Sequence, residues 1–210
     1  PGDRPLVVTA NPGPAAEELA RRGWPVPQGE PLGGEERATL VATFLGRYAK
    51  SLGPEHTRQL LASPLTRNPL FLVAVLDELR QHGDHFTLGE RITDYLGAET
   101  IDDLYERILA RWERDFERDR PGLVADAFTA VWAARRGLTE AELLELLGPG
   151  DGTPLPRAHW SPLFLAAERS LASRSGTIGF FHDFRRTAVR AGYLPFAADQ
   201  RAAHAHLAAC

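Results

Sequence analysis

The 210-residue sequence contains no methionine and a single cysteine, Cys210, which is its last residue. Because there is no second cysteine, the chain forms no internal disulfide and no cysteine-ligated metal cluster, and we expect a reducing compartment. No apolar run reaches the roughly 18–20 residues that cross a bilayer, and no signal peptide opens the chain. These absences predict a soluble, cytoplasmic protein with no membrane partner. Since the chain begins on PGDRPLVVTA, without methionine, we take it to be a piece of a larger protein.

An excess of basic residues is also missing. The formal net charge is −4 at pH 7 and the isoelectric point is near 6.0. Affinity for nucleic acid depends on basic side chains that neutralise phosphates. The composition therefore disfavours a nucleic-acid partner.

Several motifs that carry chemistry are absent as well. The sequence has no G-x-x-x-x-G-K-[ST] phosphate loop and no apolar strand that ends in paired acids, so neither Walker A nor Walker B is present. Its histidines do not have zinc-ligand spacing, and no nucleophile-elbow pattern occurs. We predict no catalytic residue and no metal ligand, and the fragment alone is not expected to hydrolyse a nucleotide.

The sequence pattern divides the chain into four segments. Residues 1–33 hold an apolar run at 5–10, read as a buried strand, and then a helix. Residues 34–120 alternate amphipathic helices with short loops, which predicts a compact bundle. Residues 121–195 predict three helices followed by a β-hairpin, the layout of a winged-helix domain, and residues 196–210 begin a further helical segment.

Local signals mark where helices begin. Thr87–Glu90 and Thr139–Glu142 each match the capping-box pattern, in which a threonine and a glutamate satisfy free N–H groups at a helix start. Ser161-Pro162 is read as a cap followed by a first-position proline. The two capping boxes each predict a helix that starts at that point, and the helix with Ser161-Pro162 is expected near His159–Leu171.

The clearest start lies at Asn68-Pro69, because asparagine can cap a helix and proline suits its first position. The helix would run from there to Gly83, and its first two turns are apolar all round. It must therefore be enclosed by other elements. A capped N-terminus in an apolar shell can receive a flat or anionic ligand group, although these residues alone favour a buried core helix.

A second stretch, Phe180-Phe181-His182-Asp183, follows the last strand of the predicted hairpin. Asp183 can cap the next helix, and His182 would sit at the end of the strand, where an imidazole can donate a hydrogen bond to an anion. Viewed alone, the pair favours a structural role. The arginines of the following helix, at positions 185, 186 and 190, favour a solvated or interface face.

Three stretches in this order resemble the STAND-type nucleotide-binding switches of the NACHT and NB-ARC group, which are AAA+-like signalling proteins. The matches are RNPLFL to the GNPL-type helix start, GLTEAELLELLG to the winged-helix core, and FFHDF to the MHD-type motif. Bacterial nephrocystin-3-like multidomain proteins are the most similar. The resemblance implies a mainly α fold class: the end of an α/β P-loop ATPase core at 1–33, a helical lid at 34–120, and a winged-helix domain at 121–195.

The resemblance also implies a ligand and its contacts. Asn68, Pro69 and Leu70 would lie at the adenine, His182 would bind the β-phosphate of ADP, and Asp183 would support the loop of His182. The cofactor would be ADP or ATP, with magnesium in the parent protein, and the parent would be a slow ATPase. Its partners would be the ATPase core of the same chain, further copies of the parent on activation, and a downstream repeat domain.

Two alternatives need no nucleotide. A DNA-binding regulator would present a reading helix near Arg157–Leu171, but apolar side chains dominate this stretch, where a reading helix should expose basic and amide groups. The other alternative is a winged-helix or helical protein-interaction module that docks a partner through apolar faces.

Overall fold

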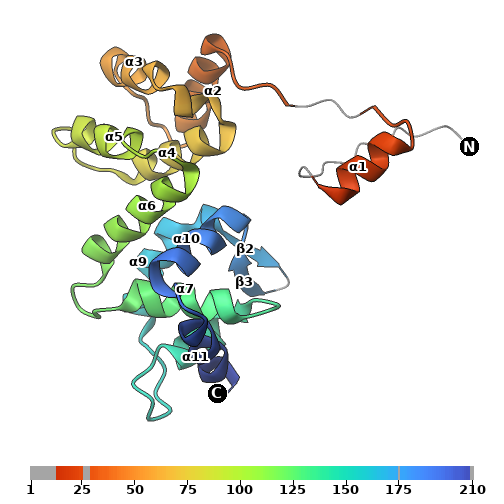
Figure 1. Cartoon of the computed structure of the whole chain (residues 1–210). Coiled ribbons are helices and arrows are strands. Elements are labelled where there is room, and N and C mark those ends of the chain that lie inside the picture. The colour runs from red at the N-terminus through yellow and green to blue at the C-terminus, as the bar shows by residue number, and fades with distance from the viewer. Residues whose placement is uncertain (1–12, 26–28, 175, 209–210) are drawn as a thin grey trace, which may run out of the picture. The chain divides into compact units, whose positions relative to one another are not determined.

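A computed structural model of the chain describes residues 13–25, 29–174 and 176–208 (Figure 1). The structure divides the chain into two units, Pro1–Pro31 and Leu32–Cys210. The described part of the first unit contains one helix, α1 (Pro14–Arg21), which begins with a proline, where the missing N–H costs nothing. None of its residues is buried, so α1 has no core of its own.

The predicted fold class is wrong in its first part. The end of an α/β ATPase core needs parallel strands covered by helices, whereas every described strand belongs to one small antiparallel sheet. The predicted strand at Pro5–Ala10 lies outside the described residues. The described residues therefore form helices and this one sheet, without an α/β P-loop core.

The larger unit begins with helices that pack around α4. Eight of the thirteen residues of α4 are buried, as its apolar sequence requires, and the side-chain oxygen of Asn68 accepts a hydrogen bond from the N–H of Leu70 at 2.9 Å. The predicted capped and enclosed helix is thus confirmed. The elements of this part are α2 (Gly34–Gly46), α3 (Pro54–Ala62), the 3-10 turn η1 (Pro64–Arg67), α4 (Pro69–Gln81), α5 (Leu88–Leu96) and α6 (Ile101–Phe116).

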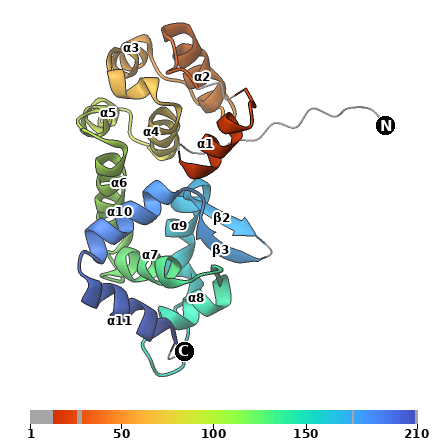
Figure 2. The ribbon, with the colours of Figure 1, turned by 45° about the vertical axis from the view of Figure 1, so that its right-hand side comes forward.

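The second part of the unit combines helices with the sheet. Strand order is β1-β3-β2, and α10 lies beside α6 and α7 in both ribbon views (Figure 2). Its elements are α7 (Leu123–Ala133), β1 (Leu138–Thr139), α8 (Glu140–Leu146), α9 (Arg157–Ala167), the 3-10 turn η2 (Glu168–Ser170), β2 (Leu171–Arg174), β3 (Thr177–Phe180), α10 (Asp183–Tyr193) and α11 (Ala197–Ala208).

The predicted hairpin is confirmed as β2 and β3, which pair antiparallel from Leu171 opposite Phe180 to Arg174 opposite Thr177. Strand β1 adds to the other edge of β3 and contains only two residues. A glycine at the start of β1 allows this close approach: Gly137 has a φ of +79°, and a Cβ there would lie 2.5 Å from the carbonyl oxygen of Ile178.

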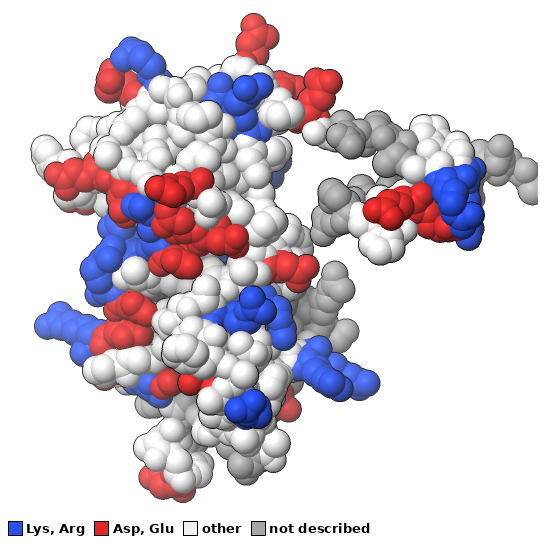
Figure 3. Space-filling view, in the orientation of Figure 1, with Lys and Arg blue, Asp and Glu red and all other residues white. Residues whose placement is uncertain are grey.

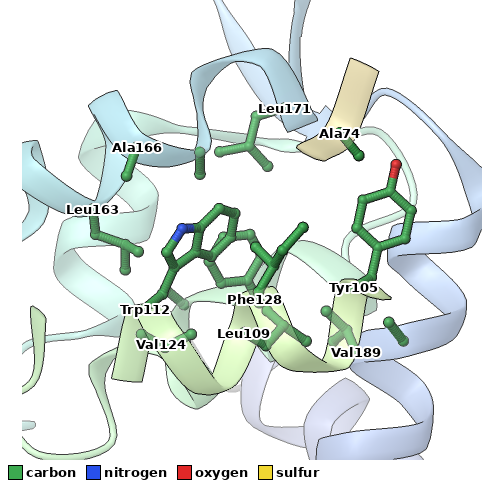
Figure 4. Close-up of a cluster of buried hydrophobic side chains, with 14 of the residues drawn as sticks. Ala74, Tyr105, Leu109, Trp112, Val124, Phe128, Leu163, Ala166, Leu171 and Val189 are labelled. Carbon is green, nitrogen blue, oxygen red and sulfur yellow. The ribbon is translucent and has the colours of Figure 1, made fainter. Parts of the chain in front are cut away.

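One hydrophobic core runs through both parts of the larger unit. At its centre the ring of Trp112 from α6 stacks on Phe128 from α7, with centroids 5.3 Å apart. Side chains from α4, α9, β2 and α10 close around this pair (Figure 4). Since the packing is shared, the helices before and after residue 120 form one folded body.

Not every local signal acts as expected. Thr139 and Glu142 form the predicted capping box at the start of α8. Thr87 does not cap α5, because its hydroxyl donates to the carboxylate of Asp84 instead. The helix predicted near His159–Leu171 is α9, which runs from Arg157 to Ala167. Ser161-Pro162 therefore does not mark its start, and Pro162 lies inside the helix. Burial of Trp160 and Leu163 on one face of α9 outweighs the backbone hydrogen bond that a proline inside a helix removes.

Candidate functional site

The five residues predicted as a binding site lie at two helix starts. Asn68 and Pro69 are exposed at the start of α4, and Leu70 follows them half-buried. His182 and Asp183 are exposed at the start of α10. His182 itself occupies the capping position and Asp183 is the first helical residue, and neither side chain forms a capping hydrogen bond. The prediction that Asp183 caps the helix is therefore wrong.

The fold brings these two helix starts together at a small hollow of about 90 Å³, which we call the Leu70 hollow. Two of the predicted site residues, Leu70 and His182, line this hollow in the described part of the chain. Its wall includes exposed and buried side chains from α4, α6, η2 and α10. The lining residues are Leu70, Val73, Ala74, Asp77, Tyr105, Arg169, Ser170, Phe181, His182 and Arg185.

Arg185 forms the buried wall of the Leu70 hollow. The sequence favoured a solvated or interface position for Arg185, whereas in the structure Arg185 is buried and only 6% exposed. Its guanidinium lies 4.6 Å from the ring centre of Tyr105 and 4.8 Å from that of Trp112. Burial lowers the pKa of Arg185, because a charge in an apolar surrounding loses its hydration. Among the described residues its Nη1 has no hydrogen-bond partner.

Behind this wall lies a buried ion pair between α4 and α6. Glu78 Oε2 is 2.7 Å from Arg111 Nε and accepts a hydrogen bond from the hydroxyl of Tyr95 at 2.9 Å. Burial raises the pKa of Glu78, since desolvation outweighs the attraction of Arg111. Desolvation is the largest single effect on Arg111 and opposes its charge, but Glu78, Tyr95 and Asp115 together outweigh it and raise the pKa of Arg111. These groups are enclosed, so they support the site and do not face a ligand.

A second hollow, of about 330 Å³, lies between the loop that precedes β1, strand β3 and the start of α10; we call it the Arg186 hollow. Its described wall contains three arginines, Arg135, Arg136 and Arg186, and one acid, Asp183. The remaining lining residues are uncharged: Val131, Ala134, Gly137, Thr177, Gly179, Phe180 and Phe181.

Phe181 lines both hollows and is 59% exposed. Phe184, one turn further on, is 43% exposed. An exposed aromatic ring between two hollows is costly in water and stabilising in contact with another molecule. The sequence placed Phe181 in the FFHDF stretch but gave no sign that its ring would face solvent. Phe181 follows the last residue of a strand, where the alternation of buried and exposed side chains no longer predicts which way a side chain points.

Other kinds of site are not found in the described part of the chain. No group of three or more histidine, cysteine, aspartate or glutamate side chains there could hold a metal ion. No described helix is both long enough and apolar enough to cross a membrane. The apolar face of α9 packs into the core through Trp160, Leu163 and Ala166.

Comparison with known proteins gives sequence relatives but no structural ones. No protein-family model matches the chain, and no solved structure matches it. The chain is 34% identical over 179 residues to a TPR repeat-containing protein of Dictyostelium discoideum, a match that covers 85% of this chain and 11% of that protein. It is 25% identical over 159 residues to tetratricopeptide repeat protein 41 of Rattus norvegicus, covering 65% of this chain and 12% of the relative. The chain thus spans about a tenth of the length of the curated relatives it matches.

These relatives overturn the resemblance to STAND-type switches. They are named for tetratricopeptide repeats and not for a nucleotide-binding switch. The predicted family and the predicted switch function are therefore wrong. So are the lid and winged-helix roles that depend on this function, and the assignments to NACHT, NB-ARC and ATP-binding proteins. An ATPase core as the intramolecular partner loses its support as well.

The structure supplies a physical reason for the misleading motifs. RNPLFL is a capped helix start with a first-position proline, GLTEAELLELLG holds a capping box, and FFHDF joins a strand to a helix. Each stretch is explained by local backbone chemistry that recurs in unrelated folds. No finding tests ADP, ATP or the nucleotide contacts of the five residues, which stay predictions.

Proposed function

We propose that this chain is a protein-interaction module within a larger tetratricopeptide-repeat protein, and that it binds a protein segment at the surface around Phe181. The names of the relatives support a parent of this kind. The described chain itself contains a sheet, which the helix–turn–helix unit of such repeats lacks. The module would therefore be a segment beside the repeats of its parent.

The observation that carries the proposal is the exposed ring of Phe181 between two hollows. Single exposed apolar side chains are common on protein surfaces. Here the ring lines the Leu70 hollow together with the half-buried side chains of Leu70 and Val73. A second exposed aromatic residue, Phe184, follows three positions later. An aromatic anchor beside pockets is the usual centre of a protein interface.

The experiment places a photo-reactive benzophenone amino acid at position 181 of the full-length parent, expressed in its own host. After irradiation, the cross-linked peptides are identified by mass spectrometry. Phe86 provides the matched control, because it is a phenylalanine 93% exposed in the loop between α4 and α5, away from both hollows. We expect protein adducts at position 181 well above those at position 86. Equal or absent adducts at the two positions would overturn the proposal.

A companion variant checks that the ring itself matters. Phe181→Ser should reduce capture of the cross-linked partner about tenfold or more, since truncating an anchor of an interface costs about 2 kcal/mol. Phe86→Ser should leave capture unchanged. Because both rings are exposed, neither change should lower the melting temperature.

A further inference from the structure

The Arg186 hollow has a local charge opposite to that of the whole chain. Three arginines and one aspartate line it, a formal charge of +3 − 1 = +2, whereas the chain carries −4. Arg135, Arg136 and Arg186 are all exposed, and none of them forms an ion pair with a described acidic side chain. Figure 3 shows basic and acidic side chains in separate small groups over the described surface.

Some exposed arginines elsewhere in the described chain have carboxylate partners: Arg58 is next to Glu55, and Arg157 pairs with Glu140. Others, such as Arg114, form no ion pair with a described acidic side chain. Arg186 instead lies over the ring of Trp132, 5.0 Å from its centre, which holds the guanidinium in place and leaves its N–H groups without a described carboxylate. The three arginines thus offer unused donors at one site.

Apolar surface lies directly between these charges. Val131 and Ala134 are buried at the end of α7, Phe180 is half-buried, and the exposed ring of Phe181 forms one edge. A volume of about 330 Å³ is in the range of pockets that hold ligand groups, roughly 300–1,000 Å³. The hollow can therefore receive an apolar side chain while the arginines contact charged neighbours of that side chain.

We propose that the Arg186 hollow binds an acidic protein segment, in which an apolar side chain enters the hollow and flanking aspartates or glutamates pair with Arg135, Arg136 and Arg186. This inference rests on the proposed function and names the chemistry of the partner. Planar guanidinium groups bind carboxylates through two parallel hydrogen bonds. Complementary charge also speeds the encounter and rejects basic segments.

The chain offers a way to block the hollow without removing charge. Gly179 lines it, and a Cβ built there meets nothing within 4 Å. A Cβ at position 179 thus meets no obstacle, and we use Gly179→Leu to place a side chain in the hollow. Gly137, which also lines the hollow, cannot serve for this purpose, because its Cβ would meet the backbone of Ile178.

The test uses the full-length protein and a fluorescent peptide built of glutamate pairs and leucines, with fluorescence anisotropy as the readout. A second peptide replaces each glutamate by glutamine, and a third replaces each leucine by serine. We expect the protein to bind the first peptide and neither of the other two. The affinity for the first peptide should fall as ionic strength rises, because salt screens exposed charges. Arg135→Glu, Arg186→Glu and Gly179→Leu should each weaken binding about tenfold or more. Arg58→Glu, a charge reversal on α3, should have no effect.

Three results would overturn the inference: equal binding of the glutamine peptide, binding that survives both charge reversals at the hollow, or displacement by a single-stranded oligonucleotide that binds through the same arginines.

Cross-linking at position 181 then separates the two proposals. If adducts form there and persist with Arg186→Glu, the interaction module stands and the acidic segment is wrong. If no adducts form above the Phe86 control, the interaction module itself fails.

Discussion

The side chain of Arg185 shows how one residue can join two parts of a fold. Its guanidinium is enclosed by Tyr105 and Trp112 of α6, although it belongs to α10. Its alkyl stem and flat head group contribute packing as well as charge. Loss of the whole side chain should therefore cost more than loss of the charge alone.

We expect Arg185→Ala to lower the free energy of unfolding by about 3 kcal/mol, as for other buried charged side chains that lose packing and leave partners behind. Arg185→Met should cost less, because it keeps most of the apolar stem. The exposed Arg190→Ala is the control and should change stability by less than about 0.5 kcal/mol. Chemical denaturation followed by circular dichroism measures all three; equal effects of the three variants would contradict this role.

Glu78 gives the fold a pH dependence. Burial raises the folded-state pKa of Glu78 above the ordinary value of 4.5, so the folded state holds its proton more tightly than the unfolded chain. The unfolding free energy therefore falls as pH rises from about 4.5 through the folded-state pKa. Glu78→Gln has no such proton to lose. Wild type should lose stability relative to the variant as pH is raised across this window, in urea unfolding at several pH values; a relative gain would reverse the assigned direction.

At the scale of the element, β1 depends on one glycine. Gly137 combines a φ of +79° with a backbone contact that leaves no room for a Cβ. Gly150 has a similar φ of +85° but open space around it. The pair separates backbone strain from steric conflict within one protein.

We expect Gly150→Ala to cost about 1 kcal/mol, the strain of a left-handed backbone for a residue with a Cβ. Gly137→Ala should cost clearly more, because β1 must also move away from β3. Melting temperatures of the two variants measure the difference. Equal losses would mean that the sheet edge can shift freely to accept the extra carbon.

For the whole molecule, the shared core decides how residues 32–210 unfold. Leu72 of α4 and Leu163 of α9 are both fully buried members of the one core cluster. Because packing is continuous between them, we expect one cooperative transition. Leu72→Ala and Leu163→Ala should each lower the stability of that single transition by about 2–5 kcal/mol. Two separate transitions, each sensitive to only one variant, would show independent domains.

The sequence by itself determined the elements whose signals are local. Three elements were predicted from residues that lie close together in the chain: the helix start at Asn68-Pro69, the capping box at Thr139–Glu142, and the hairpin of β2 and β3. Each depends on hydrogen bonds between residues a few positions apart. Local signals failed where distant packing competed with them, as at Pro162 inside α9.

Only the tertiary structure decided the candidate site. It placed Leu70 beside His182, buried Arg185, left the ring of Phe181 in solvent, and brought Arg186 of α10 to the same hollow as the loop that holds Arg135 and Arg136. None of these follows from spacing along the chain, because burial and charge at a surface depend on which elements pack together. For the same reason, three short motifs in a plausible order suggested a family that the relatives do not support: each motif records how a helix begins, which many unrelated folds share.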